Sequence, residues 1–157
     1  MITSTRPSRQ PLLVRSPGNA DYTRWRDLYR GYADFYGVQQ TDEPADTVWS
    51  WIHDPHHEVD CLLVESNPGY VVGLAHFRPF ARPLIGGTGC FLDDLFVDPA
   101  ARGTGAADAL LDELNRLAAV NGWSVVRWIT ADDNYRGRAK YDQFATRTAW
   151  VTYDMTR

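Results

Sequence analysis

The chain has 157 residues, a formal net charge of −4 and a hydrophobic fraction of 44%, a composition typical of one ordinary folded domain. The acidic balance argues against unspecific nucleic-acid binding, and two cysteines are too few for a disulfide framework. No apolar run is long enough to span a bilayer, and the first ten residues lack the apolar core of a secretory leader. We therefore expect a cytoplasmic protein with neither a nucleic-acid nor a membrane partner.

The first half of the chain predicts one strand, two helices and a hairpin. We expect residues 1–9 to form a loose arm and residues 10–16 a strand. Helices are predicted at residues 21–37 and 42–54, and the first places aromatic and apolar residues at helical spacing: Trp25, Leu28, Tyr29, Tyr32 and Tyr36. The runs 58–66 and 70–80 predict two hairpin strands around the turn Asn67-Pro68-Gly69.

The second half alternates strands and helices. A strand is predicted at residues 90–99, an amphipathic helix at 105–122, and a largely apolar, central strand at 123–130. A helix capped by residues 131–134 and ending near Ala145, then a strand at 148–155, complete the chain. The order β-α-α-β-β-β-α-β-α-β predicts a single α/β (α+β) domain, with a mixed sheet that carries helices on both faces.

Cysteines and histidines give two narrower expectations. Cys61 and Cys90 lie in apolar runs, so we expect them to be buried thiols. The run HDPHHEVD at residues 53–60 is interrupted by a proline and has no cysteine ligand, so we expect no metal site there.

The run VDPAARGTGAA at residues 97–107 lies where a predicted strand turns into a predicted helix. The first turn of a helix offers unpaired N–H groups and a partial positive charge, and small residues let an anion approach them closely. We therefore interpret the turn as a pyrophosphate cradle made by Arg102, Gly103, Thr104, Gly105, Ala106 and Ala107. A plain tight turn is the alternative that the spacing leaves open.

Two other phosphate motifs fit this turn poorly. A Walker loop would end in Gly-Lys followed by Ser or Thr, and no such triplet follows. A dinucleotide fingerprint would have a small residue where Asp108 stands and an acidic residue after the next strand. A nucleotide-binding module is therefore disfavoured.

The stretch LFVDPAARGTGAADALLDEL at residues 95–114 resembles the pyrophosphate motif of the GNAT acetyltransferase superfamily, with Arg102, Gly105 and Ala107 at its defining places. The stretch from Asn134 to Asp154 resembles the second motif of that superfamily, in which an Asn opens a helix and a Tyr, here Tyr141, follows seven residues later. The resemblance covers at least residues 57–155 and is greatest to the small histone- and polyamine-acetyltransferase-like branch. It implies a mostly antiparallel central sheet.

The resemblance implies that the cofactor is acetyl-CoA, whose pyrophosphate lies on the cradle. The pantetheine arm is then expected to pair with the backbone of Leu95, Phe96 and Val97, where this strand parts from its neighbour, and to meet Asn134 on its other side. The sequence departs from the superfamily in two places. Ala145-Thr146 replaces a frequent Gly-Phe pair, and Ile129 stands where some members have a Glu that acts as general base.

Acetyl transfer to an amine requires removal of an ammonium proton and protonation of a leaving thiolate. The resemblance assigns the second task to Tyr141. Asp93 and Asp94 are adjacent on one strand and should face opposite ways. We favour Asp93 as the base, directly or through water. Asp94, His76 and water alone remain alternatives, and Asp94 or His76 can instead bind substrate.

The residues before the motifs suggest where the acceptor binds. Tyr32 and Tyr36, together with Tyr29, can line an amine pocket, because aromatic faces attract cations; a buried helix face is the alternative. No cysteine lies in either motif, so we expect direct attack on acetyl-CoA in a ternary complex. The acceptor is then a small amine, polyamine, amino acid or protein amine.

Two further expectations concern the rival function and the assembly. A non-catalytic acyl-CoA-binding regulatory domain is the rival, although a pure binder has no need of Tyr141. Only one strand is predicted after the last helix, which leaves a sheet edge to cover. We therefore expect a homodimer in which C-terminal strands meet or exchange.

Overall fold

The computed structural model describes residues 11–157, and the arm expected at residues 1–9 lies outside them. A five-stranded sheet runs in the order β1-β2-β3-β4-β5, antiparallel except for the parallel β4–β5 pair. Its strands are β1 (Leu13–Arg15), β2 (Asp60–Asn67), β3 (Tyr70–Arg82), β4 (Gly87–Val97) and β5 (Val126–Arg127). The mixed sheet predicted from the sequence is confirmed.

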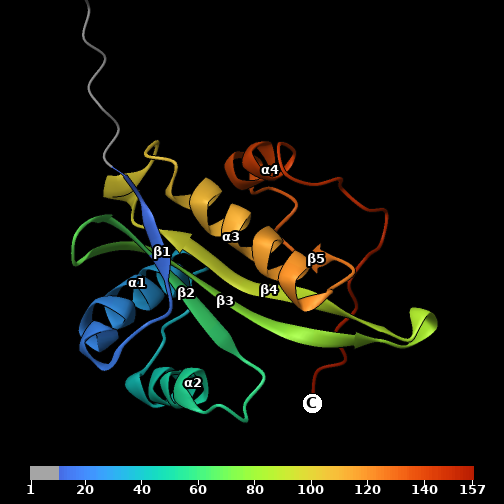
Figure 1. Cartoon of the computed structure of the whole chain (residues 1–157), viewed down its shortest axis with the longest axis horizontal. Helices are drawn as coiled ribbons and strands as arrows, with labels where there is room; N and C mark the ends of the chain where they lie inside the picture. The colour runs from blue at the N-terminus through green and yellow to red at the C-terminus, as the bar shows by residue number, and fades with distance from the viewer. Residues whose placement is uncertain (1–10) are drawn as a thin grey trace, which may run out of the picture.

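Helices cover both faces of this sheet, as expected (Figure 1). One face carries α1 (Tyr22–Phe35) and α2 (Asp42–His53), and the other carries α3 (Ala106–Asn121). The last helix, α4 (Tyr135–Tyr141), follows β5. Each face has its own apolar core: α3 buries Leu110, Leu111 and Leu114 against one side, and α1 buries Trp25 and Leu28 against the other.

Cys61 and Cys90 are both free thiols with no exposed surface, as predicted. Burial raises the pKa of the Cys61 thiol well above its usual value and that of Cys90 to about 11. Neither thiol is therefore in the nucleophilic thiolate form at neutral pH.

The predicted strand at residues 148–155 is absent. These residues form no ladder with any described strand, and their apolar side chains lie open, with Trp150 84% and Tyr153 90% exposed. The red C-terminal trace in Figure 1 runs past β5 without joining the sheet. A strand needs a neighbour to pair with, and among residues 11–157 this segment has none.

The predicted central strand at residues 123–130 is also shorter than expected. Only Val126 and Arg127 pair, and they pair with β4 alone, so β5 is an edge of the described sheet. The sequence pattern was that of a buried strand, but the divergence of β4 ends the ladder after two residues.

Within residues 11–157, no helix is both long and apolar enough to cross a membrane. The same part of the chain contains no cluster of three His, Cys, Asp or Glu side chains arranged to hold a metal ion.

Candidate active site

A groove of about 390 Å³ opens between β4, the start of α3 and helix α4. It collects most of the residues that the sequence assigned to a cofactor. The predicted residues that line it are Leu95, Phe96, Val97, Arg102, Gly103, Gly105, Ala106, Ala107, Asn134 and Tyr141, joined by Tyr32 and Tyr36 from α1 and the segment after it. Thr104 does not line the groove, because its hydroxyl donates to the Ala101 carbonyl within the turn.

The glycine turn has the geometry of an anion cradle. Gly103 and Gly105 adopt φ values of +77° and +89°, which other residues rarely adopt. Gly105 is the N-cap of α3, and the first helical bond runs from the Ala109 N–H to the Gly105 carbonyl. The amides from Gly105 to Asp108 have no backbone acceptor in the described chain and remain available to an anion, whereas the Arg102 and Thr104 N–H groups donate to the Pro99 and Ala101 carbonyls.

The strand gap expected beside Phe96 is present. β4 pairs with β5 only at Cys90 and Phe91, while its other edge stays paired with β3 as far as Val97. From Leu92 to Val97, the backbone groups of β4 on the β5 side have no ladder partner among the described strands. This free edge can pair with an extended chain laid along the groove.

Three cations surround the cradle, and two of them were not predicted. Arg136 and Lys140 on α4 line the groove with Arg102, and Lys140 Nζ lies 2.7 Å from the Asp108 carboxylate on α3. Their spacing of four residues puts them on one face of a helix, a signal that the sequence did carry. Amides, cations and a free strand edge together fit a molecule with a pyrophosphate and an extended arm.

Asn134 and Tyr141 lie at the two ends of α4. The Asn134 side chain caps the helix by accepting from the Gly137 N–H, and its amide donates to Thr130. The Tyr141 ring packs edge-on against Trp128, with centroids 5.4 Å apart. Burial raises the pKa of Tyr141, so its hydroxyl keeps its proton at neutral pH.

The expectation that Asp93 and Asp94 face opposite sides of the sheet is wrong. In the β3–β4 ladder His76 pairs with Asp94 and Phe77 pairs with Leu92, so Asp93 is the extra residue of a bulge. The Asp94 carboxylate contacts His76 at 2.8 Å, and the Asp93 carboxylate contacts Arg78 at 3.1 Å. Because positions 76 and 78 lie on one face of β3, both carboxylates lie on the face that carries α1.

The same bulge explains how β4 serves both cores. Before the bulge, Cys90 and Leu92 face α3, and after it Leu95 and Val97 face α3 as well. Two residues separate Leu92 from Leu95, whereas residues on one face of a regular strand are separated by an odd number. A regular strand would have turned Leu95 away. The sequence did not reveal this bulge, because Phe91 and Phe96 are apolar as well, so apolar residues occur on both faces of the strand on either side of Asp93.

Asp94 lies among aromatic side chains of α1. Burial and the nearby Asp94 carboxylate raise the pKa of Tyr29 to about 12 and that of Tyr32 above its usual range. The Tyr32 ring packs edge-to-face against Tyr36, which lines the groove. Asp93 lies beside this cluster, and burial raises the pKa of its carboxyl while Arg78 opposes the rise.

His76 is 1% exposed, and both its ring nitrogens are engaged. Trp25 Nε1 donates to Nε2 at 2.9 Å, and Nδ1 lies 2.8 Å from Asp94. No ring nitrogen of His76 is therefore free to take a proton from a substrate, which corrects the expectation that His76 can serve as base. The sequence placed Trp25 on the apolar face of its helix but gave no sign of this hydrogen bond.

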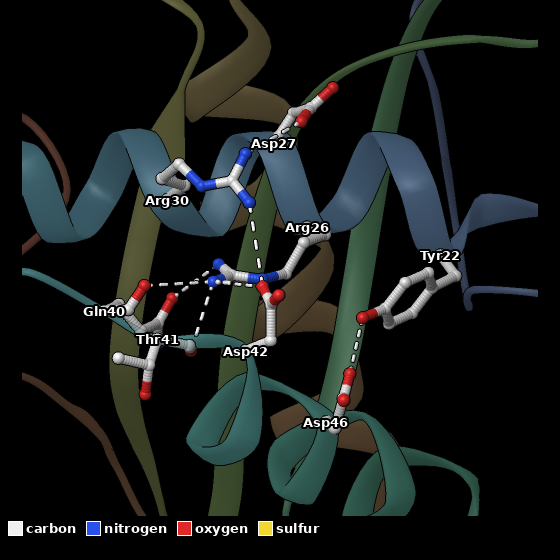
Figure 2. A network of polar contacts seen from close by, with 8 residues as sticks. All are labelled: Tyr22, Arg26, Asp27, Arg30, Gln40, Thr41, Asp42 and Asp46. Atoms are coloured by element: carbon white, nitrogen blue, oxygen red, sulfur yellow. Dashed lines mark hydrogen bonds and ion pairs between the residues drawn. The ribbon is translucent and has the colours of Figure 1, made fainter.

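A buried arginine fixes the segment between α1 and α2 (Figure 2). The Arg26 guanidinium donates to the Gln40 side chain at 2.9 Å, to the carbonyls of Gln40 and Thr41 at 3.1 Å, and to Asp42. Tyr22 on α1 adds a hydrogen bond to Asp46 on α2. This network holds the chain that follows Tyr36 and was not foreseen, because arginines in amphipathic helices usually face solvent.

Comparisons with known proteins agree with this geometry. The family model described as "Acetyltransferase (GNAT) family" matches residues 25–145. The chain is 24% identical over 143 residues to the D-amino-acid N-acetyltransferase HPA3 of Saccharomyces cerevisiae, covering 90% of this chain and 89% of that protein. It is 28% identical over 142 residues to the uncharacterized N-acetyltransferase YhfO of Bacillus subtilis, covering 89% and 94%.

Solved structures share the fold at lower identity. A ribosomal-protein-alanine N-acetyltransferase from Brucella melitensis superposes with a TM-score of 0.77 at 23% identity, covering 94% of this chain and 99% of that one. The protein AAC(6')-Iy, solved with a CoA-containing bisubstrate analogue, has a TM-score of 0.77 at 16% identity, with the same coverage.

Proposed function

The chain belongs to the GNAT acetyltransferase family and its cofactor is acetyl-CoA, and from that premise we propose that it acetylates a primary amine by direct attack in a ternary complex. The observation that carries the proposal is the single groove in which the glycine cradle, the free edge of β4 and Tyr141 meet. Acetyl-CoA supplies the acetyl group as a thioester.

The cradle and the strand gap hold the cofactor. Backbone amides from Gly105 to Asp108 receive the pyrophosphate, with the charges of Arg136 and Lys140 beside them. The backbone of Leu95, Phe96 and Val97 and the side chain of Asn134 hold the pantetheine arm. The contact between Asp108 and Lys140 joins α3 and α4 at the entrance of the groove.

Tyr141 acts as general acid. Tyr141 lines the groove and its hydroxyl stays protonated well above neutral pH, so it can donate its proton to the sulfur as the carbon–sulfur bond breaks. Asp93 acts as general base, directly or through water. Burial raises the pKa of Asp93, which makes it a better proton acceptor than an ordinary surface aspartate once it is ionised.

The acceptor amine enters from the α1 side. Tyr32 and Tyr36 line that end of the groove, and Asp94 with His76 lies behind them. The yeast relative is named for D-amino acids, so D- and L-amino acids are the first acceptors to test. Polyamines, other small amines and protein amines complete it.

Direct attack is supported by the cysteines. Both are buried away from the groove, and both have raised pKa values. Neither is placed to carry an acetyl group between the two substrates. Buried free thiols also suit a reducing compartment, and we propose a cytoplasmic location.

The proposal includes a homodimer. The apolar side chains that follow β5 and α4 are widely exposed, namely Ile129, Trp150, Val151, Tyr153 and Met155. β5 is an edge strand beside them, and a second copy of the C-terminal segment can pair there. Light scattering at several concentrations tests this, and a monomer mass at every concentration would contradict it.

The first experiment measures CoA-thiol release from acetyl-CoA against an amine panel. The panel contains D- and L-amino acids, polyamines, simple alkylamines and a lysine peptide. Release with one class, and acetylated product detected by mass, supports the proposal. Cofactor binding without release for any amine would favour a binding domain that lacks the chemistry.

A further inference from the structure

A buried chain of hydrogen bonds ends on one of the two carboxylates at the acceptor side. Trp25 Nε1 donates to His76 Nε2 at 2.9 Å, and His76 Nδ1 lies 2.8 Å from Asp94 Oδ2. Trp25 has no exposed surface and His76 is 1% exposed, whereas the Asp94 side chain is 18% exposed. This series of hydrogen bonds therefore begins at Trp25 in the core and ends at the partly exposed carboxylate of Asp94.

This arrangement determines which nitrogen of His76 carries the proton. An indole N–H can only donate, so Nε2 must be the unprotonated, accepting nitrogen. A neutral imidazole has one N–H, and it is then on Nδ1, where it donates to Asp94. His76 is neutral and oriented from both sides.

The described partner of Asp94 carries no positive charge, unlike that of Asp93. Asp93 is paired with the guanidinium of Arg78 at 3.1 Å. The described hydrogen-bond partner of Asp94 is the neutral His76 N–H, and the rings of Tyr29 and Tyr32 lie near its carboxylate. Neutral donors orient a carboxylate without neutralising it.

The aromatic side chains around Asp94 suit a cation as well. The Tyr29 ring lies edge-on to His76 with centroids 4.7 Å apart, and Tyr32 continues the wall toward Tyr36 at the groove. A carboxylate has about four acceptor positions, and the described hydrogen bond from His76 leaves room for a further donor. Aromatic faces around an unneutralised carboxylate attract an ammonium group.

We propose that Asp94 binds the ammonium group of the acceptor, and that Trp25 and His76 are positioning residues that hold Asp94 for this task. The inference rests on the proposed function and separates the two carboxylates: Asp94 binds the cation and Asp93 takes its proton. It also gives a role to a tryptophan that touches neither substrate nor cofactor.

Kinetics test the positioning role, with the best amine of the panel as substrate. Asp94→Asn and His76→Leu should each raise KM for the amine by about 10- to 100-fold, the value of a hydrogen bond to a charged group, with KM for acetyl-CoA unchanged. His76→Asn should recover most of the loss, because an asparagine amide can place an N–H near the position of Nδ1. His56→Asn on the exposed loop is the matched control.

The rescue distinguishes positioning from packing. A histidine that only fills the core would make the Asn variant as poor as the Leu variant, or would change both KM values together, and either result would overturn the proposal. Trp25→Phe should also raise the amine KM by freeing Nε2, with Trp51→Phe on the outer part of α2 as its control.

A spectroscopic readout separates this proposal from the proposed function, because it needs no turnover. The 15N NMR signals of His76 are assigned among those of the four histidines by their disappearance in His76→Asn. In the wild type they should show a protonated Nδ1 and an unprotonated Nε2. Butylammonium should shift the Nδ1–H resonance in the wild type and not in Asp94→Asn, whereas n-butanol should not shift it. A protonated Nε2, or equal shifts with both ligands, would refute the role of Asp94 even if acetylation is observed.

Discussion

Replacing Tyr141 with Phe removes one oxygen from the centre of the proposed chemistry. The ring can keep its edge-on contact with Trp128 at 5.4 Å, so the free energy of unfolding should change by no more than about 0.5 kcal/mol. General acids contribute about 10²- to 10⁴-fold to rate. Because Tyr141 lines an open groove that water can enter, we expect the lower end, a loss of about 100-fold in kcat, or about 2.7 kcal/mol in barrier.

Thiol release under saturating acetyl-CoA and amine measures this loss. KM for acetyl-CoA should change little, since the hydroxyl acts on the leaving sulfur. Tyr135→Phe, on the same helix but 74% exposed, is the matched control and should keep the wild-type kcat. A Tyr141→Phe enzyme within twofold of wild type would refute the assignment of the acid.

The pH dependence of kcat is a second test of Tyr141 as the general acid. Burial raises the pKa of Tyr141 above its usual value near 10, so the protonated form persists to higher pH. The wild-type rate should therefore show no loss from this group between pH 7 and about 10. A decline that begins lower and vanishes in Tyr141→Phe would contradict the raised pKa.

Three other substitutions test the framework of the site. Gly105→Ala places a Cβ at φ +89°, so it should lower the free energy of unfolding by about 1–2 kcal/mol and also weaken acetyl-CoA binding. The control Gly69→Ala, at φ +81° in the β2–β3 turn, should lower stability without changing acetyl-CoA binding. Calorimetry with and without the cofactor measures both effects. Gly31→Ala puts a Cβ 2.8 Å from the Phe96 ring, so the denaturation midpoint should fall by the equivalent of about 1–3 kcal/mol; an unchanged midpoint would show that Phe96 moves freely. Asp98→Asn breaks the ion pair with Arg24, which lowers the pKa of Asp98, so the pair stabilises the fold above pH about 4 and this stabilisation is lost as pH falls. The variant should be less stable than wild type by about 0.5–1 kcal/mol at pH 7 and equally stable near pH 2. An equal loss of stability at both pH values would contradict the role of the ion pair.

Residues close together in the sequence carried most of the prediction. The helix periods of α1 and α3, the hairpin turn at Gly69 and the small residues from Gly103 to Ala107 all express local rules of backbone geometry. The spacing from Asn134 to Tyr141 belongs to the same class, since seven residues span two helical turns. These features were predictable because each depends on its own neighbours along the chain.

The acceptor side was less predictable, because its geometry depends on strand register. Whether Asp93 and Asp94 share a face depends on one bulge in the β3–β4 ladder, and a bulge forms where two strands meet. The hydrogen bond from Trp25 to His76 joins residues 51 apart, and Arg26 finds its partners only once the segment at residues 40–42 folds back on α1.

The sequence by itself determined the order of elements up to α4 and the small-residue turn before α3, because short-range spacing decides these, and its resemblance to the GNAT superfamily supplied Tyr141 as the candidate acid. Only the tertiary structure decided how long β5 is, that residues 148–155 have no strand partner within the described chain, and which carboxylate stays unneutralised beside the tyrosines. Strand pairing and side-chain hydrogen bonding are relations between distant segments, and their free energy exists only when those segments meet.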